Sequence, residues 1–320
     1  MTAYIIRRVL WGIVLLLLVS ALTFLFFYVF PSADPALLRA GRNASPANIA
    51  YIRHELGLDK PIYTQFFSYM KGIILHGNFG YSYYSGQSVL SLIKNRLPAT
   101  ISLAVGAAIV WLMMGVFVGI ISAIKRGSIL DRAAMGTALI FVSMPVFFLG
   151  LLMLFTFAND IGKFHIFPAA GSYVGLTYDP VKWFESLLLP WFVLASTNAA
   201  IYSRLLRGSL LEVMGEDYIR TARAKGLGER RVIMRHGVRS AITPIVTVLG
   251  LDIGFLLGGA VIAEKVFNIH GVGLLNYQAI VSSDFPIVQA TVLLAAMFIV
   301  IANIAVDIAY AYLDPRVRYS

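Results

Sequence analysis

The 320-residue sequence contains no cysteine and few charged residues. Without cysteine the chain has no disulfides, no thiolate chemistry and no zinc–thiolate site. Charged residues make up 13%, about half their usual share of roughly 25%, whereas hydrophobic residues make up 59%. A soluble globule of this size would leave large apolar patches in water. Intrinsic disorder is excluded as well, because 13% of the residues are aromatic. The composition therefore predicts a protein that lies mainly in lipid.

The motifs of common enzymes are also missing. Gly162-Lys163 is followed by Phe164 and does not complete a phosphate-binding loop. The five histidines lack the spacing of metal ligands, and no nucleophile elbow of the G-x-S-x-G kind is present. We therefore expect that the chain is not an enzyme, holds no catalytic residue, metal or cofactor, and binds no nucleic acid. Transport or signalling remains.

Six apolar stretches are long enough to cross a bilayer, which takes about 20 residues at 1.5 Å each. They are Val9–Phe30, Ala99–Ile124, Ala133–Ala158, Trp183–Ser203, Ala241–Ala263 and Pro286–Tyr310. The first exceeds the 7–15 residues of a signal-peptide core, so we expect it to be retained. The predicted fold class is an all-α polytopic membrane protein with six transmembrane helices.

Lysine and arginine predict the orientation of these spans. Six spans place both termini on one side, and the termini with the even-numbered connections hold sixteen Lys and Arg residues. The two short connections on the other side hold only Lys163, Lys182 and Lys265. Positive residues in short loops stay in the cytoplasm. We expect a multi-pass protein of the inner or plasma membrane with both termini in the cytoplasm.

Three regions follow along the chain. Residues 1–30 form the cytoplasmic N-terminus and first span, residues 31–98 an external subdomain, and residues 99–320 a five-helix core. In the external region Ala47–Leu56 and Pro61–Leu75 have helical spacing of apolar residues, and Gly77–Gly86 is typical of a loop. We expect this subdomain to lie on the membrane surface.

The cytoplasmic connection from Arg204 to Ser240 is unusually long, at about 37 residues against the usual two to six. Its pattern predicts a helix, a glycine break and a second helix. Glu216 and Asp217 fall at the start of the first helix, where the macrodipole favours acidic residues, and Gly226 can end it. The exposed surface is expected to include Tyr218, Ala222 and Leu227. From the residues alone, a basic hairpin touching lipid headgroups is an alternative.

Residues Arg220-Thr-Ala222-Arg-Ala-Lys-Gly226 resemble the EAA loop of ABC-importer permease subunits, and most closely the version in the peptide/nickel permease family, first-permease type. Arg220 and Thr221 replace the first two residues of the general Glu-Ala-Ala pattern. The resemblance implies a coupling helix that docks on an ATP-hydrolysing subunit. The residues expected to couple to that ATPase are Glu216, Asp217, Tyr218, Thr221, Ala222, Lys225, Gly226 and Leu227.

Further segments resemble the same family in order and spacing. They include Pro31-Ser-Ala-Asp34-Pro35, His54 to Pro61, Gly77-Asn-Phe-Gly80, Arg96-Leu-Pro98, Phe167 to Gly171 and Leu313-Asp-Pro-Arg316. The resemblance implies a second permease subunit, two ATPase subunits and an extracytoplasmic solute-binding protein as partners, besides membrane lipid. The second permease is expected to be a different chain, and ATP and magnesium are expected only in the ATPases.

Two aspartates lie within predicted spans, where a charge costs about 2.5–3.5 kcal/mol on insertion scales. Asp252 lies in Gly250-Leu-Asp-Ile-Gly254-Phe-Leu-Leu-Gly258, a repeated small-xxx-small pattern that permits close helix packing. One hypothesis is that Asp252, with Gly254 and Gly258, lines the substrate path and meets the amino end of a peptide. The alternative is an aspartate buried against a Ser, Tyr or Asn of a neighbouring helix. For Asp307 we expect snorkelling or a surface ion pair.

The segment from Glu264 to Gly273 resembles the external gate loop of the family, with Phe267, His270, Gly271 and Gly273 as its candidate residues. The alternative is that the glycines serve only the turn of a short external connection. Pro145 is expected to kink the third span.

The predicted function is that of a permease subunit forming half of the path of an ATP-driven importer for short peptides or related solutes. Dipeptides, longer peptides, glutathione-like molecules and nickel chelates all remain possible cargoes. One alternative is a proton-coupled secondary transporter with Asp252 and Asp307 as relay groups, although no inverted repeat is evident. Another is a membrane scaffold that uses the basic loop to hold a partner.

Overall fold

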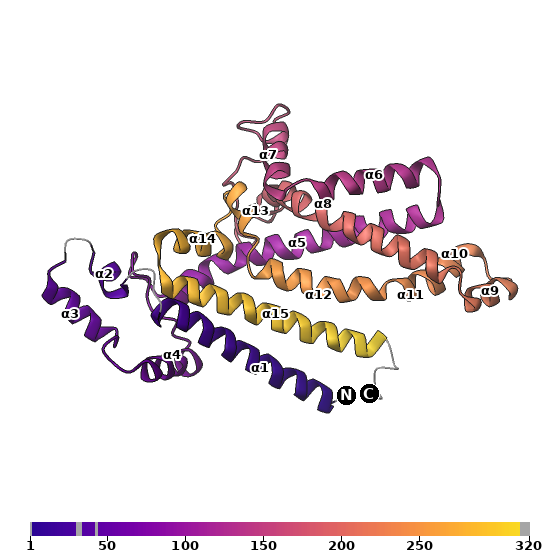
Figure 1. Cartoon of the computed structure of the whole chain (residues 1–320). Helices are drawn as coiled ribbons and strands as arrows, with labels where there is room; N and C mark the ends of the chain where they lie inside the picture. The colour runs from indigo at the N-terminus through magenta and orange to yellow at the C-terminus, as the bar shows by residue number, and fades with distance from the viewer. Residues whose placement is uncertain (1, 30–33, 42–43, 314–320) are drawn as a thin grey trace.

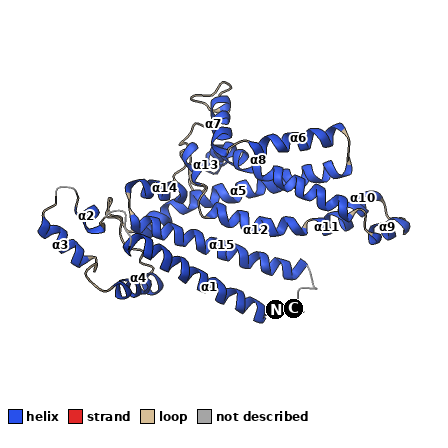
Figure 2. Cartoon of the chain, viewed as in Figure 1, coloured by secondary structure: helices blue, strands red, loops and turns tan. Residues whose placement is uncertain are grey.

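A computed structural model describes residues 2–29, 34–41 and 44–313. These residues are almost entirely helical and contain no strand (Figure 2). The helices run as follows: α1 Thr2–Phe24, η1 Leu25–Val29, α2 Pro35–Ala40, α3 Pro46–Glu55, α4 Ile62–His76, α5 Val89–Ile124, α6 Ile129–Ser143, α7 Val146–Phe157, α8 Pro180–Val213, α9 Asp217–Ala224, α10 Glu229–Arg231, η2 Val232–Gly237, α11 Val238–Ala241, α12 Thr243–Leu257, α13 Val261–Val266, α14 Val272–Ser282 and α15 Phe285–Leu313. The segments 31–33 and 314–316, used above for the resemblance, lie outside the described residues, as do the C-terminal arginines.

Four helices of the described chain are individually long and apolar enough to cross a membrane. They are α1 with η1 (Ile5–Val29), α5, α8 and α15 up to Ile308. Two bent pairs, α6 with α7 and the α10–α11 segment with α12, raise the number to six if each pair is one span. The all-helical membrane fold is confirmed, and four of the predicted spans coincide with single helices.

The break at Pro145 is much sharper than a kink. The helices α6 and α7 meet at 105°, so the prediction of one kinked helix over Ala133–Ala158 is wrong. Met144 adopts an extended conformation with ψ of 125°, as expected of a residue before proline, and Pro145 precedes the first turn of α7. The chain therefore turns aside, and α7 packs against α13 and α8.

The fifth predicted span, Ala241–Ala263, is also interrupted. The axis bends by 49° between α11 and α12, and α12 ends at Leu257. Gly259 has a φ of +123°, which only glycine adopts readily, and α13 starts two residues later. The residues from Gly258 to Ala263 thus form a turn and a short helix.

The pair α5 and α8 forms the centre of the core. Glycines on α5 let the two backbones approach: a Cβ on Gly119 would lie 2.9 Å from the Ser203 carbonyl oxygen. Trp111 and Tyr202, both fully buried, pack with ring centroids 6.0 Å apart. At the end of α8 nearest α9, Arg207 forms a bidentate pair with Asp131 of α6 at 2.8 Å. These contacts join α5, α6 and α8 into one unit.

In the region predicted to be external, the described residues before α5 form three helices. The structure confirms the two predicted there, since α3 and α4 start and end within a residue of the expected ranges. The short helix α2 was not predicted. Asp34 caps it by accepting a hydrogen bond from the Ala36 N–H, and Ser45 caps α3 through the Asn48 N–H.

The molecule is elongated along its spanning helices. Figure 1 shows α2, α3 and α4 at one end and α9 and α10 at the other, with the start of α1 and the end of α15 toward the α9 end. Near the termini, Arg8 of α1 donates to Asp307 of α15 at 2.9 Å, so the predicted surface ion pair of Asp307 is confirmed. The external and cytoplasmic features predicted from the sequence thus lie at opposite ends.

Candidate functional site

The predicted helix, glycine break and second helix are all present between α8 and α12. The helix α8 continues to Val213, well beyond the predicted end of its span at Ser203. Helix α9 has Glu216 at its N-cap and Asp217 in its first turn. Gly226 has a φ of +74°, which allows the chain to reverse after α9. The returning arm consists of α10, η2 and α11.

A small hydrophobic core supports α9. Ile219, Ala222 and Val232 are buried together, and Val213, Met214 and Leu227 pack around them. Ala222 is only 7% exposed, so its predicted place on the exposed surface is wrong. It lies three residues after Ile219, on the same side of the helix, where both side chains meet η2. Leu227 is partly buried in the same core.

The opposite side of α9 is open to solvent. We call the exposed side chains of Asp217, Tyr218, Thr221 and Lys225 the α9 face. Tyr218 is 44% exposed, although a large aromatic residue gains from being covered. The Thr221 hydroxyl donates back to the Asp217 carbonyl at 2.9 Å, which satisfies it within the helix.

An ion pair ties α9 to the returning arm. Arg223 donates to both carboxylate oxygens of Glu229, at 2.7 and 3.1 Å. This hydrogen bond raises the pKa of the Arg223 guanidinium. The pair bridges the turn that contains Gly226 and Gly228.

Asp252 contacts the neighbouring helix α8. Its carboxylate accepts a hydrogen bond from the Tyr202 hydroxyl at 2.8 Å, and the aspartate is half-buried. The tyrosine contact anticipated as the alternative to a substrate role is thus present. Asp252 and Asp307 have different partners, Tyr202 and Arg8, on different helices.

The glycines around Asp252 face α15. A Cβ on Gly254 would lie 3.1 Å from the Ile299 Cα, and one on Gly258 would lie 2.9 Å from the Ala295 Cβ. Gly250 packs in the same way against Val306. Close helix packing is confirmed for these glycines, whereas Asp252 contacts α8. That Gly254 and Gly258 line the substrate path stays a prediction.

Most of the predicted external gate loop is buried. Of its four candidate residues, Phe267 is 4% exposed, Gly271 and Gly273 are buried, and His270 is exposed. The loop is held by Glu264 of α13, whose carboxylate accepts from the Leu274 N–H and the Thr100 hydroxyl, both at 2.7 Å. Thr100 in turn accepts from the Val272 N–H at 2.8 Å.

The Glu264 carboxylate explains why residue 271 is a glycine. A Cβ on Gly271 would collide with the Glu264 carboxylate group, so only glycine fits there without moving it. Glu264 is fully buried in α13, outside the candidate spans, and burial raises the pKa of its carboxyl group. Sequence reasoning missed Glu264 and Thr100 as a pair, because 164 residues separate them.

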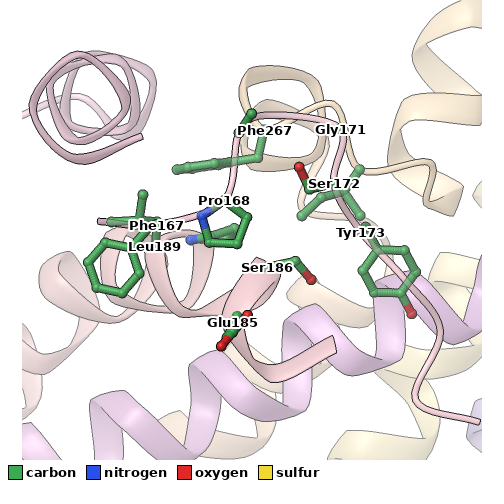
Figure 3. Close-up of a pocket in the computed structure, with 12 residues that line it drawn as sticks. Phe167, Pro168, Gly171, Ser172, Tyr173, Glu185, Ser186, Leu189 and Phe267 are labelled. Atoms are coloured by element: carbon green, nitrogen blue, oxygen red, sulfur yellow. The ribbon is translucent and has the colours of Figure 1, made fainter. Parts of the chain in front are cut away.

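Phe267 covers a small pocket between the α7–α8 connection and α8. Figure 3 shows its ring near Phe167 and Pro168, with Ser172 and Glu185 on other sides of the pocket. The Gly171 N–H donates to the Phe267 carbonyl at 2.9 Å and holds the two loops together. The cavity measures about 10 Å³, enough for about one water molecule and too small for a solute.

Two family profiles match nearly the whole chain. Residues 115–319 match the binding-protein-dependent transport system inner membrane component. Residues 1–104 match the N-terminal part of the same transport system membrane component. The two matches meet within α5, and the second includes the whole external region.

Curated relatives match over the full length. The chain is 41% identical over 319 residues to a protein of Brucella abortus (strain 2308) named as a peptide transport system permease, covering 100% of both chains. It is 38% identical, with the same coverage, to the glutathione transport system permease protein of Escherichia coli (strain K12). A solved structure of the MetNI methionine ABC transporter has a chain with a TM-score of 0.55 and 18% identity, covering 70% of this chain and 97% of that one.

Proposed function

Because this chain belongs to the binding-protein-dependent transport system inner membrane components, as a permease subunit of an ABC importer, we propose that the α9 face docks on its ATPase. Members of this family are multi-pass inner-membrane proteins and are not enzymes. They work with a partner permease, an ATPase and a solute-binding protein.

One observation carries the proposal. The α9 face presents an exposed tyrosine over a rigid support at one end of the molecule, away from the external helices (Figure 1). Buried tyrosines are frequent anchors of protein interfaces. The buried core of Ile219, Ala222 and Val232 ties α9 to both of its arms, so a partner that moves α9 also moves those arms.

The two arms lead to the centre of the membrane region. Helix α8 runs unbroken from Pro180 to Val213, about 50 Å at 1.5 Å per residue, and the returning arm continues into α12. The Tyr202–Asp252 hydrogen bond joins α8 and α12 in between. An ATP-driven shift of α9 therefore acts on both helices that hold this bond. Such a shift changes access only if the docked ATPase favours one arrangement of the helices.

The proposal includes the assembly and its orientation. Two different permease chains surround one path, two ATPase subunits bind on the cytoplasmic side with ATP and magnesium, and a binding protein delivers solute outside. Both termini lie in the cytoplasm. Support comes from the basic residues of the α9 region and from the position of the start of α1 and the end of α15 toward the α9 end.

We propose short peptides, including glutathione-like ones, as the cargo. Support comes from the full-length relatives named for peptide and for glutathione transport. Asp252 is the group of this chain proposed to meet the amino end of such a peptide. The proton-coupled and scaffold alternatives receive no support from these relatives.

Substitution of Tyr218 tests the docking proposal. In vesicles containing the complete importer, Tyr218→Ala is expected to lower binding-protein-stimulated ATP hydrolysis and uptake, with an unchanged amount of folded permease. Loss of an interface anchor costs about 2 kcal/mol, or roughly thirtyfold in affinity. Tyr51→Ala, at an exposed tyrosine of helix α3, is the matched control. Normal coupling in the Tyr218 variant would refute the docking role.

Substitution of Asp252 tests its role in the path. If Asp252 contacts the peptide, Asp252→Asn raises the KM for uptake more than Tyr202→Phe does. Both variants remove or weaken the same hydrogen bond, but only the first removes the charge. Equal effects on KM would assign Asp252 to the α8–α12 contact alone. Uptake is measured with a panel of dipeptides, longer peptides and glutathione.

A further inference from the structure

The external helix α4 has two unlike sides. One side packs on α1, where Phe66 meets Phe24 with ring centroids 5.3 Å apart. A neighbouring side exposes large apolar residues that recur at helical spacing. We call Tyr63, Phe67 and Ile74 the α4 face, and each is more than half exposed.

Contacts with α1 set the depth of α4. The Ser20 hydroxyl donates to the Met70 sulfur at 3.0 Å, and Phe24 packs against Phe66 and Tyr69. The first candidate span runs from Ile5 to Val29, so Phe24 lies about 10 Å beyond its midpoint at 1.5 Å per residue. Half of the hydrocarbon core is about 15 Å thick. By the same count Ser20 lies about 5 Å beyond the midpoint, so these contacts place α4 beside the outer half of the first span.

An apolar groove continues below α4. Its cavity measures about 310 Å³ between α1, α4, α5 and α15. Ile13 and Leu17 of the first span, 49% and 44% exposed, line it together with Ile74 of the α4 face. Ser20 is the one polar side chain of its lining, and that hydroxyl already donates to Met70. The exposed surface of a spanning helix thus runs without interruption onto α4.

Another side of α4, which faces α3, is polar. A second cavity of about 500 Å³ lies between α1, α3 and α4. Its lining includes Arg39, Glu55, Lys60, Gln65 and Ser68. Helix α4 therefore separates an apolar groove from a cavity suited to water.

We propose that α4 is an interfacial helix, with its α4 face in the outer leaflet and an acyl chain of a phospholipid in the groove. Continuity with the surface of the first span identifies the occupant as lipid. Tyr63 and Phe67 are of the type that concentrates at membrane interfaces. This helix anchors the external region beside the span that carries it.

Spin labelling tests the proposal directly, because the chain has no cysteine and single cysteines can be introduced without a background. Nitroxides are attached to Phe67→Cys, Ile74→Cys and Leu17→Cys, with Ser68→Cys as the matched control on the same helix. The full chain and its partner subunits are placed in vesicles of phosphatidylethanolamine and phosphatidylglycerol. Accessibility to oxygen, which concentrates in lipid, is compared with accessibility to a water-soluble nickel chelate.

The expected result is an oxygen-to-nickel ratio several-fold higher at Phe67, Ile74 and Leu17 than at Ser68. Nickel accessibility at Phe67 and Ile74 as high as at Ser68 would place the α4 face in water and overturn the proposal. Low accessibility of these sites to both reagents would mean that a protein partner covers the face, and would overturn it as well. None of these outcomes depends on whether α9 docks on an ATPase.

Discussion

The two connections that flank α12 are built in opposite ways. In the connection before α12, α9 exposes Tyr218, Thr221 and Lys225 and keeps only a small apolar support. After α12, the turn between α13 and α14 is held by Glu264 and Thr100, which are buried and hydrogen-bonded within the chain. The first connection therefore leaves polar and aromatic side chains uncovered, as the proposed docking requires, whereas the second pairs its buried polar groups internally. The same kind of substitution should therefore affect stability and transport differently in the two connections.

Removal of a glutamate is expected to give the largest difference in thermal stability between variants of the two connections. Glu264→Ala leaves the Leu274 N–H and the Thr100 hydroxyl without their buried acceptor, which costs about 3 kcal/mol. The matched change Glu216→Ala removes a side chain that makes no cap hydrogen bond, so the folded state is expected to keep its stability. Thermal unfolding in detergent measures both. Equal melting temperatures would contradict the contrast between the loops.

Replacement of a glycine by alanine is expected to give the second largest difference between the two connections. Gly271→Ala forces the Glu264 carboxylate out of its hydrogen bonds, at an expected cost of about 2 kcal/mol. Gly228→Ala introduces the same methyl into open space at an ordinary φ of −59°. Uptake and protein level are both expected to fall for the first variant only. A loss in the Gly228 variant would show that the α9 region is tighter than its contacts indicate.

Loss of an exposed cation gives the smallest effect on folding. Lys265→Gln removes a contact with Tyr277 at 2.7 Å, and Arg223→Gln removes the pair with Glu229. Exposed pairs contribute little to stability, so neither melting temperature is expected to change measurably. The Arg223 variant is nevertheless expected to couple less well, since the pair holds α9 against its arm. Stimulated ATP hydrolysis separates this effect from stability.

Local patterns predicted the parts of the structure that depend on neighbouring residues. Four spans, the helices α3 and α4, and the turn at Gly226 were all predicted from runs of apolar residues, prolines and glycines. The angle at Pro145 was not, because a proline indicates a break and not the direction in which the chain continues. That direction is set by the contacts of α7 with α13, more than 100 residues later.

The candidate site also has features that the sequence predicts and features that it does not. The acidic start of α9 and its glycine end were predicted from the helix dipole and the positive φ of glycine. The burial of Ala222 depends on Val232, across the loop, and an eight-residue helix is too short to show which face is covered. Likewise, Asp252 was singled out by its charge, but its Tyr202 partner lies 50 residues away. Sequence patterns identify such groups, and tertiary packing selects their contacts.

Cysteine crosslinking between α9 and the ATPase tests the central claim most directly. Thr221→Cys, on the α9 face, is paired with single cysteines along the ATPase surface in the complete importer, and Ala222→Cys serves as a buried control. Docking predicts that Thr221→Cys forms a crosslink whose yield changes when ATP is bound, and that the control forms little. If Thr221→Cys yields no ATPase adduct with or without nucleotide, α9 is not the docking helix.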